Sequence, residues 1–141
     1  MADYSIGIDI GGTNTKFGIV DKKGNILEQD RILTNEKDGV HDFIDLLYNK
    51  LKPMIDKHGG NKNFSGIGMG APNGNYYTGN IEYAPNLKWK GIIPIAQMVS
   101  DKFGLPARLT NDANAAAMGE MMYGCAKNMR DFIVITLGTG V

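Results

Sequence analysis

A glycine-rich turn near the start of the chain contains the first residues whose types and spacing could do chemistry. Asp9 and Ile10 are followed by Gly11, Gly12, Thr13, Asn14, Thr15 and Lys16. Glycines let backbone amides approach phosphate oxygens with no Cβ in the way, and successive amides in a turn form an anion-binding nest. Thr13 adds a hydroxyl donor, and Asp9 could hold a magnesium ion through its water shell. The pattern favours a phosphate site over its alternative, an ordinary hairpin turn.

A second candidate is the pair Asn111 and Asp112, at an expected junction between a strand and a helix. Asp112 could be an N-cap that accepts hydrogen bonds from the first helical amides. It could instead be a general base at the end of a sheet strand, which is where ligands bind in open α/β sheets. Asn111 can both donate and accept hydrogen bonds, which suits sugar hydroxyls.

A long polar loop over residues 70–91 is the third candidate, and it is rich in Asn, Gly and Tyr. Amide side chains beside aromatic faces are typical of a carbohydrate site, although the same composition describes a turn-rich surface loop. A loop of this length inside a compact domain is usually functional or disordered, and its aromatic residues and prolines favour an ordered one. Trp89 could be a lid over this loop or a packing anchor.

The hydrophobic pattern predicts the elements that position these segments. Alternation and buried apolar runs predict strands over 4–10, 16–21, 26–33, 64–69, 107–110 and 131–137. Helical spacing predicts helices over 40–55, 92–103 and 112–123. Pro53 is expected to kink or shorten the first helix, and Gly59 and Gly60 to stop it. The order is that of a ribonuclease-H-like α/β core, with a mixed sheet in which an antiparallel β-meander is followed by parallel strands and flanking helices.

The end of the chain repeats the pattern of its beginning. Residues 133–140 form an apolar strand followed by the glycine turn of Gly138, Thr139 and Gly140. We therefore expect a first domain over 1–125, then a linker with the first strand and phosphate turn of a second domain over 126–141, and interpret the chain as a fragment. Core and domain-junction packing is expected of Met118, Met121, Met122 and Met129.

The composition excludes several classes of protein. Of 141 residues, 43% are hydrophobic, which suits one folded domain rather than a disordered chain. Fifteen basic and fifteen acidic residues cancel, which removes the electrostatic case for nucleic-acid binding. One cysteine and two distant histidines make a metal cluster improbable. With no membrane span and no secretory signal in the sequence, we expect a cytoplasmic protein.

Five ordered segments resemble the ROK family of sugar kinases and sugar-responsive repressors: IGIDIGGTNTKFGIVD, GIGMGAPNG, APNLKW, NDANAAAMGE and ITLGTGV. The likeness extends over residues 6–141 and is greatest to the bacterial glucokinases of the family. It implies the actin-like ATPase fold, with two ribonuclease-H-like domains and a cleft between them. The implied activity is ATP-dependent phosphorylation of a hexose, glucose to glucose 6-phosphate, with ATP and Mg²⁺ as cofactors. In the full-length protein we expect a homo-oligomer, a dimer.

The resemblance also implies roles for individual residues. Nucleotide contacts are expected at Asp9, Gly11, Gly12, Thr13, Asn14, Lys16, Gly138, Thr139 and Gly140. Sugar contacts are expected at Ala71, Pro72, Asn86, Asn111 and Asp112. Asp112 is the expected catalytic base for the sugar 6-hydroxyl, and Asp9 the expected magnesium residue, acting through water. Many relatives have Lys in place of Asn14. The family's Glu-x-x-Gly-His sugar motif and zinc cluster are not found in this sequence, so we predict no zinc and no activity of the chain alone.

Two alternative functions share some of these motifs. A sugar-sensing regulator of the same family would need a helix-turn-helix before the glycine turn, where only eight residues precede Asp9. An actin-like ATPase would share the phosphate turns, but it would need neither the Asn-Asp pair nor the Pro-Asn loop. The sequence therefore favours the kinase.

Overall fold

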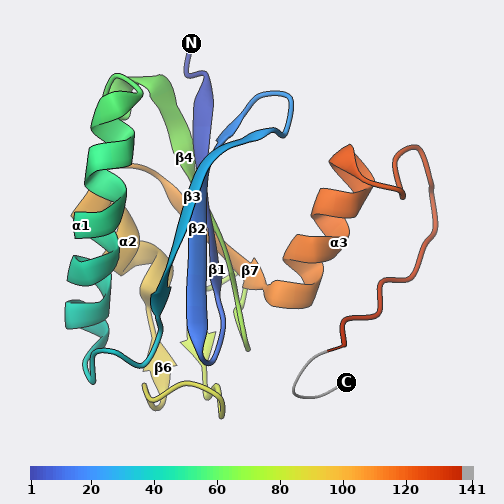
Figure 1. Ribbon diagram of the computed structural model, residues 1–141. Coiled ribbons are helices and arrows are strands. Elements are labelled where there is room, and N and C mark those ends of the chain that lie inside the picture. The colour runs from blue at the N-terminus through green and yellow to red at the C-terminus, as the bar shows by residue number, and fades with distance from the viewer. Residues whose placement is uncertain (138–141) are drawn as a thin grey trace.

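The computed structural model describes residues 1–137, which form a mixed five-stranded sheet with helices on both faces (Figure 1). The strand order is β3-β2-β1-β4-β7. The antiparallel strands are β1 (Tyr4–Ile10), β2 (Asn14–Asp21) and β3 (Ile26–Leu33), and β4 (Phe64–Ala71) and β7 (Ala107–Asn111) run parallel to β1. The predicted meander followed by parallel strands is confirmed.

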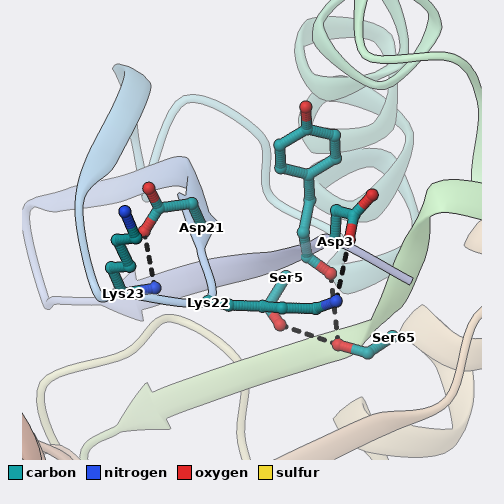
Figure 2. A network of polar contacts seen from close by, with 7 residues as sticks. Asp3, Ser5, Asp21, Lys22, Lys23 and Ser65 are labelled. Atoms are coloured by element: carbon teal, nitrogen blue, oxygen red, sulfur yellow. Dashed lines mark hydrogen bonds and ion pairs between the residues drawn. The ribbon is translucent and has the colours of Figure 1, made fainter. Parts of the chain in front are cut away.

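The β2–β3 hairpin is closed by Asp21, whose carboxylate accepts N–H bonds from Lys23 at 2.8 Å and Asn25 at 2.9 Å. Figure 2 shows this turn beside the start of β1, where Lys22 donates to Asp3 at 2.7 Å. In the same view Ser65, on β4, lies 2.8 Å from the Ser5 hydroxyl on β1. These polar contacts stand at the amino ends of the parallel strands, far from the glycine turn that follows β1.

Two helices, α1 (Val40–Lys57) and α2 (Ile95–Phe103), cover one face of the sheet (Figure 1). Helix α1 has an apolar stripe because its hydrophobic residues recur at helical spacing, and it buries Phe43, Ile44, Leu47, Leu51 and Ile55. The alternate residues of β1 that face these helices, Ile6, Ile8 and Ile10, are also buried. Trp89 is 6% exposed and its ring lies 4.6 Å from that of Phe43, so it is a packing anchor and not a lid.

Helix α1 ends before Gly59 and Gly60, as predicted, but the predicted shortening at Pro53 and the predicted start of the second helix are wrong. Helix α1 runs through Pro53 to Lys57 and is not shortened there, because Leu51 and Ile55 on either side are buried in the core. The helix predicted to begin at residue 92 begins at Ile95. Residues before a proline favour extended backbone, and those before Pro94 form β6 (Ile92–Ile93), which pairs with β5 (Ile81–Glu82) inside the long loop.

Two expectations for the C-terminal part of the chain are also wrong. The strand predicted over 131–137 does not form, because no strand of the described residues pairs with this segment and a strand needs a hydrogen-bonding neighbour. The four methionines are between 43% and 54% exposed in residues 1–137, so the expected core packing is wrong, while packing at a domain junction stays a prediction. They lie on or just after a helix with no buried residue, so no core surrounds them.

Helix α3 (Asp112–Tyr123) lies on the face of the sheet opposite α1 and α2 (Figure 1). Its bounds are those predicted. Near its start, Ala115 packs on Gly70 of β4, where an added Cβ would lie 3.2 Å from the Ala115 methyl carbon. At its end, the Tyr123 ring contacts Gly24 in the β2–β3 turn. Helix α3 therefore extends across this face of the sheet from the carboxyl end of β4 to the β2–β3 turn.

None of the helices in residues 1–137 combines the length and the apolar character needed to cross a bilayer.

Candidate functional site

The predicted site residues meet where three parallel strands end. The register aligns Asp9 of β1 with Gly70 of β4, and Ala71 of β4 with Asn111 of β7. Because β1, β4 and β7 are parallel, their carboxyl ends lie at the same edge of the sheet. The glycine turn after β1, the loop after β4 and the start of α3 all begin there, at the kind of edge where open α/β sheets bind ligands.

A cavity of about 830 Å³ lies between the sheet and α3. Asp9, Lys16 and Asp112 line it, together with Tyr76 from the long loop. Gly18, Gly7 and Gly68 are aligned across three adjacent strands, so part of its floor is bare backbone. The carboxylate before the glycine turn and the carboxylate at the start of α3 therefore share one cavity.

The pKa of Asp9, which lines this cavity, is raised. Partial desolvation by the cavity walls raises the pKa of Asp9 above its ordinary value of 3.8, and the negative charge of Asp112 raises it further. Lys16 opposes both effects. Because burial and the neighbouring negative charge both disfavour the ionised form of Asp9, a cation bound beside this carboxylate would offset that cost.

The N-cap of α3 is Asn111 and not Asp112. The Asn111 Oδ1 accepts N–H bonds from Ala113 at 2.9 Å and Asn114 at 3.3 Å, with Asn111 in extended backbone. Asp112 is the first residue of the helix, is exposed, and accepts only from the Ala113 N–H, at 2.9 Å. The capping function is thus met by its neighbour, which leaves the Asn111 amide NH₂ group free to donate to a ligand.

The glycine turn is tight, and its carbonyls point into the protein. The Gly11 N–H donates to the Asn14 carbonyl at 2.9 Å. The carbonyls of Gly11, Gly12 and Thr13 each accept a hydrogen bond from residue 34 or 35, which directly follow β3. Thr34 and Asn35 were missed as site residues because one buried threonine and one exposed asparagine after a strand carry no recognisable spacing.

Asn86 lies against the turn but does not line the cavity of Asp112. An added Cβ on Gly12 would stand 3.0 Å from the Asn86 carbonyl oxygen, so a larger residue at position 12 would fit only if the Asn86 backbone moved by a few tenths of an ångström. The Asn86 side chain faces a separate open depression of about 530 Å³, shared with Asn35, Asp38, Lys88 and Lys90.

The structure brings together part of the predicted set of residues. Asp9, Lys16 and Asp112 line the cavity, whereas the turn of residues 11–14, which connects Asp9 to Lys16 in the sequence, does not itself line it. Ala71 is buried at the end of β4 and Pro72 follows it at the start of the loop. The second predicted glycine turn, Gly138, Thr139 and Gly140, lies outside the described residues.

The carboxylates of the cavity fit magnesium better than zinc. Residues 1–137 contain no group of three or more His, Cys, Asp or Glu side chains that could hold a metal ion. Zinc sites need three or four such ligands, whereas magnesium keeps several waters and takes one or two carboxylates together with substrate phosphates. Asp9, the predicted magnesium residue, lines the cavity and supplies one such carboxylate.

The fold and this site define the class of protein: a ribonuclease-H-like α/β domain of the actin-like ATPase type. A ROK family glucokinase from Streptomyces griseus, solved in complex with glucose and AMPPNP, superimposes with a TM-score of 0.72 at 30% identity. The match covers 89% of this chain and 38% of that one.

The sequence assigns the family. The model of the ROK family matches residues 5–141, and the chain belongs to that family. Glucokinase from Halalkalibacterium halodurans is 34% identical over all of this chain and 43% of its own length. The xylose repressor of Bacillus subtilis is 32% identical over 99% of this chain and 36% of its own. The chain therefore spans less than half the length of these curated relatives.

Proposed function

We propose that the full-length protein is an ATP-dependent sugar kinase that phosphorylates a hexose, with glucose as the first candidate. The observation that supports this proposal is the shared cavity, which is lined by Asp112 and by Asp9 and Lys16, the residues on either side of the glycine turn. Similarity to glucokinases over the whole chain supports it. A glycine turn on one face and a carboxylate on the other would have no common substrate.

In this proposal Asp112 is the catalytic base. Its exposed carboxylate accepts the proton of the attacking sugar hydroxyl, while the Asn111 NH₂ group donates to a neighbouring sugar oxygen. The amides of the glycine turn would bind phosphate oxygens, and Asp9 would hold the magnesium ion. The magnesium nucleotide supplies the phosphoryl group and the charge that neutralises the developing negative charge. Positioning and charge stabilisation dominate phosphoryl transfer, so little covalent chemistry is required of the protein.

The substitution Asp112→Asn in the full-length protein tests the proposal. A general base contributes about 10²–10⁴-fold to rate, so kcat should fall by that factor while hexose affinity changes little. Because Asn111 makes the cap and Asn is as good a cap as Asp, the helix should be unaffected. The measurement is hexose-dependent ADP release.

Asp101→Asn is the matched control for this substitution, because it makes the same chemical change on α2, across the sheet from the cavity. It should retain wild-type turnover. A kcat for Asp112→Asn within about threefold of wild type would contradict the assignment of a general base, whose typical contribution is far larger.

A second candidate function is a sugar-responsive regulator, and the similarity to a xylose repressor favours it. Such a protein would use the same cavity to bind a sugar without turnover. A full-length protein that binds a sugar, releases no ADP and binds DNA in a sugar-dependent way would support the regulator. Hexose-dependent ADP release that is lost in Asp112→Asn would support the kinase.

A further inference from the structure

The peptide groups of the glycine turn are oriented by two residues that follow β3. The Thr34 hydroxyl donates to the Gly11 carbonyl at 2.7 Å, and the Asn35 Nδ2 donates to the Gly12 carbonyl at 2.9 Å. The Thr34 backbone N–H donates to the Thr13 carbonyl at 2.9 Å. Three consecutive carbonyls of the turn are therefore held by residues 34 and 35.

These three hydrogen bonds from Thr34 and Asn35, here called the clamp, also fix the direction in which the turn amides point. In a trans peptide the C=O of one residue and the N–H of the next point in opposite directions. Since the carbonyls of Gly11 and Gly12 are held towards residues 34 and 35, the N–H groups of Gly12 and Thr13 point away from them. Within residues 1–137 these two N–H groups have no protein acceptor. They are available as the donors of an anion-binding nest.

The clamp is built into the core at one end. Thr34 and Thr15 are 1% and 0% exposed, and their hydroxyl oxygens lie 2.8 Å apart. Thr34 uses its only hydroxyl proton on the Gly11 carbonyl, so Thr15 must donate to Thr34. The chain of hydrogen bonds thus runs from Thr15 through Thr34 to the turn. A buried and fully paired chain of this kind is rigid, because every alternative orientation leaves a polar group unpaired.

The same segment also touches the Pro-Asn loop. Lys88 Nζ donates to the Asn35 carbonyl at 3.1 Å and to the Asp38 carboxylate at 3.0 Å. Asn86 packs directly on Gly12 from the other side. Asp38 is fully exposed, so its ion pair with Lys88 adds little to stability. The backbone contact and the buried hydroxyls are the stronger supports of the turn.

We propose that Thr34 and Asn35 are positioning residues for nucleotide binding, which hold the glycine turn with the amides of Gly12 and Thr13 facing the phosphates. This inference rests on the proposed function of the turn as a phosphate site. It adds two residues that act through the carbonyls of the turn.

The test is Thr34→Val in the full-length protein, with AMPPNP and magnesium as the probe and calorimetry as the measurement. Valine has the shape of threonine but removes the donor to Gly11 and the acceptor of Thr15. One neutral hydrogen bond corresponds to about threefold to tenfold in affinity, so the Kd for AMPPNP should rise by about that factor. Thr34→Ser keeps the hydroxyl and should restore the wild-type Kd. The KM for hexose should stay within about twofold of wild type, whereas general unfolding would weaken both ligands alike.

Ser65→Ala is the matched control. Its hydroxyl also donates to a backbone carbonyl, that of Tyr4 at 3.1 Å, but it lies at the opposite end of β4 (Figure 2). It should leave the Kd for AMPPNP unchanged. The inference is overturned if folded Thr34→Val binds AMPPNP as tightly as wild type, or if Ser65→Ala weakens binding equally.

Asn35→Ala provides an independent test should the buried valine prevent folding. Asn35 is exposed, so its truncation leaves the core intact while the Gly12 carbonyl loses its donor. A raised Kd for AMPPNP in Asn35→Ala supports the positioning role, and an unchanged Kd overturns it. If the wild-type protein phosphorylates no hexose but Asn35→Ala or Thr34→Val still weakens AMPPNP binding, the kinase proposal fails and the positioning role stands. A wild-type protein that binds no AMPPNP overturns both.

Discussion

Asn111 and Asp112 are adjacent polar residues with different environments. The first turns its side-chain oxygen onto the helix amides, and the second exposes its carboxylate to the cavity. A helix N-terminus needs one capping oxygen, so once Asn111 supplies it, Asp112 is not required for stability. The same division applies at the glycine turn, where residues 34 and 35 satisfy the carbonyls and the amides face outward. At the start of α3 and at the glycine turn alike, a residue close in space makes the hydrogen bond that holds the backbone, and the group next to it is left available for a ligand.

The raised pKa of Asp9 predicts an effect on stability. The pKa of such a carboxyl is higher in the folded chain than in the unfolded chain. The stability that it contributes is fully present when the pH is below the unfolded-state pKa, and it is lost as the pH rises through the folded-state pKa. Asp9→Asn cannot ionise, so at neutral pH it should melt at a higher temperature than wild type. The difference in melting temperature between Asp9→Asn and wild type should vanish as the pH falls towards 3.8, the ordinary pKa of an aspartate carboxyl.

Thermal melts of the purified protein at several pH values check this prediction, and Asp101→Asn controls for the general loss of a carboxylate. The same Asp9→Asn protein should use magnesium nucleotide less well, which would make Asp9 a residue that costs stability and serves binding. Equal melting temperatures for Asp9→Asn and wild type at neutral pH would argue against an unfavourable carboxylate at this position.

Helix α3 is the element that sets the position of Asp112. It has no buried residue, so few contacts fix it on the sheet, and Gly70 is one of them. An added Cβ at Gly70 would lie 3.2 Å from the Ala115 methyl carbon and 3.4 Å from the Cα of Asp112. The small residues near the start of α3 therefore allow the general base to lie directly over the end of β4.

We expect Gly70→Ala to lower kcat by displacing the start of α3. The new methyl group would lie 3.2 Å from the Ala115 methyl carbon, which is closer than ordinary contact, so the first turns of α3 would have to move outward by a few tenths of an ångström. A misplacement of a reacting group by about 1 Å can cost 10²-fold in rate, so the shift of a few tenths of an ångström expected here should cost about tenfold. Steady-state kinetics of the full-length protein measure it.

Gly119→Ala is the companion variant for α3, because an added Cβ there has nothing within 4 Å. It should preserve kcat and stabilise the helix by about 0.5–1 kcal/mol, as alanine replaces glycine in a helix interior. If Gly70→Ala keeps wild-type kcat, the close contact between β4 and α3 does not position Asp112.

At the scale of the whole molecule, one face of the sheet is well covered and the other is not. Helices α1 and α2 bury the core side, whereas α3 covers the other side with exposed methionines and an 830 Å³ cavity beneath it. The tail over residues 131–137 is similarly exposed, with Ile133 at 90% and Leu137 at 79%. The described residues thus supply one wall of a ligand site, and a ligand is well buried only between two.

This arrangement predicts that residues 1–141 alone consume no ATP in the presence of a hexose. The full-length protein should do so, because the relatives that share this domain are more than twice as long. A coupled assay of ADP release on both proteins at equal concentration makes the comparison. Hexose-dependent ADP release by residues 1–141 would show that this domain is sufficient.

Much of the fold was predictable because its signals are local. Alternation of apolar residues predicted the meander, and helical spacing predicted α1 and α3. The errors arose where a local pattern depended on a distant partner. Residues 131–137 have the composition of a strand but no described neighbour to pair with, and Ile92–Ile93 joined a strand inside the loop rather than the helix that follows.

The sequence by itself determined which chemical groups are present and the order in which they follow strands, since glycine turns and helix starts are set by adjacent residues. Only the tertiary structure decided which of those groups meet. It placed Asp9 and Asp112 in one cavity although 102 residues lie between them in the sequence, and it placed Asn86 in another depression. It also brought Thr34 onto the Gly11 carbonyl. Contacts between segments far apart in the chain depend on strand order and register, which no short pattern encodes.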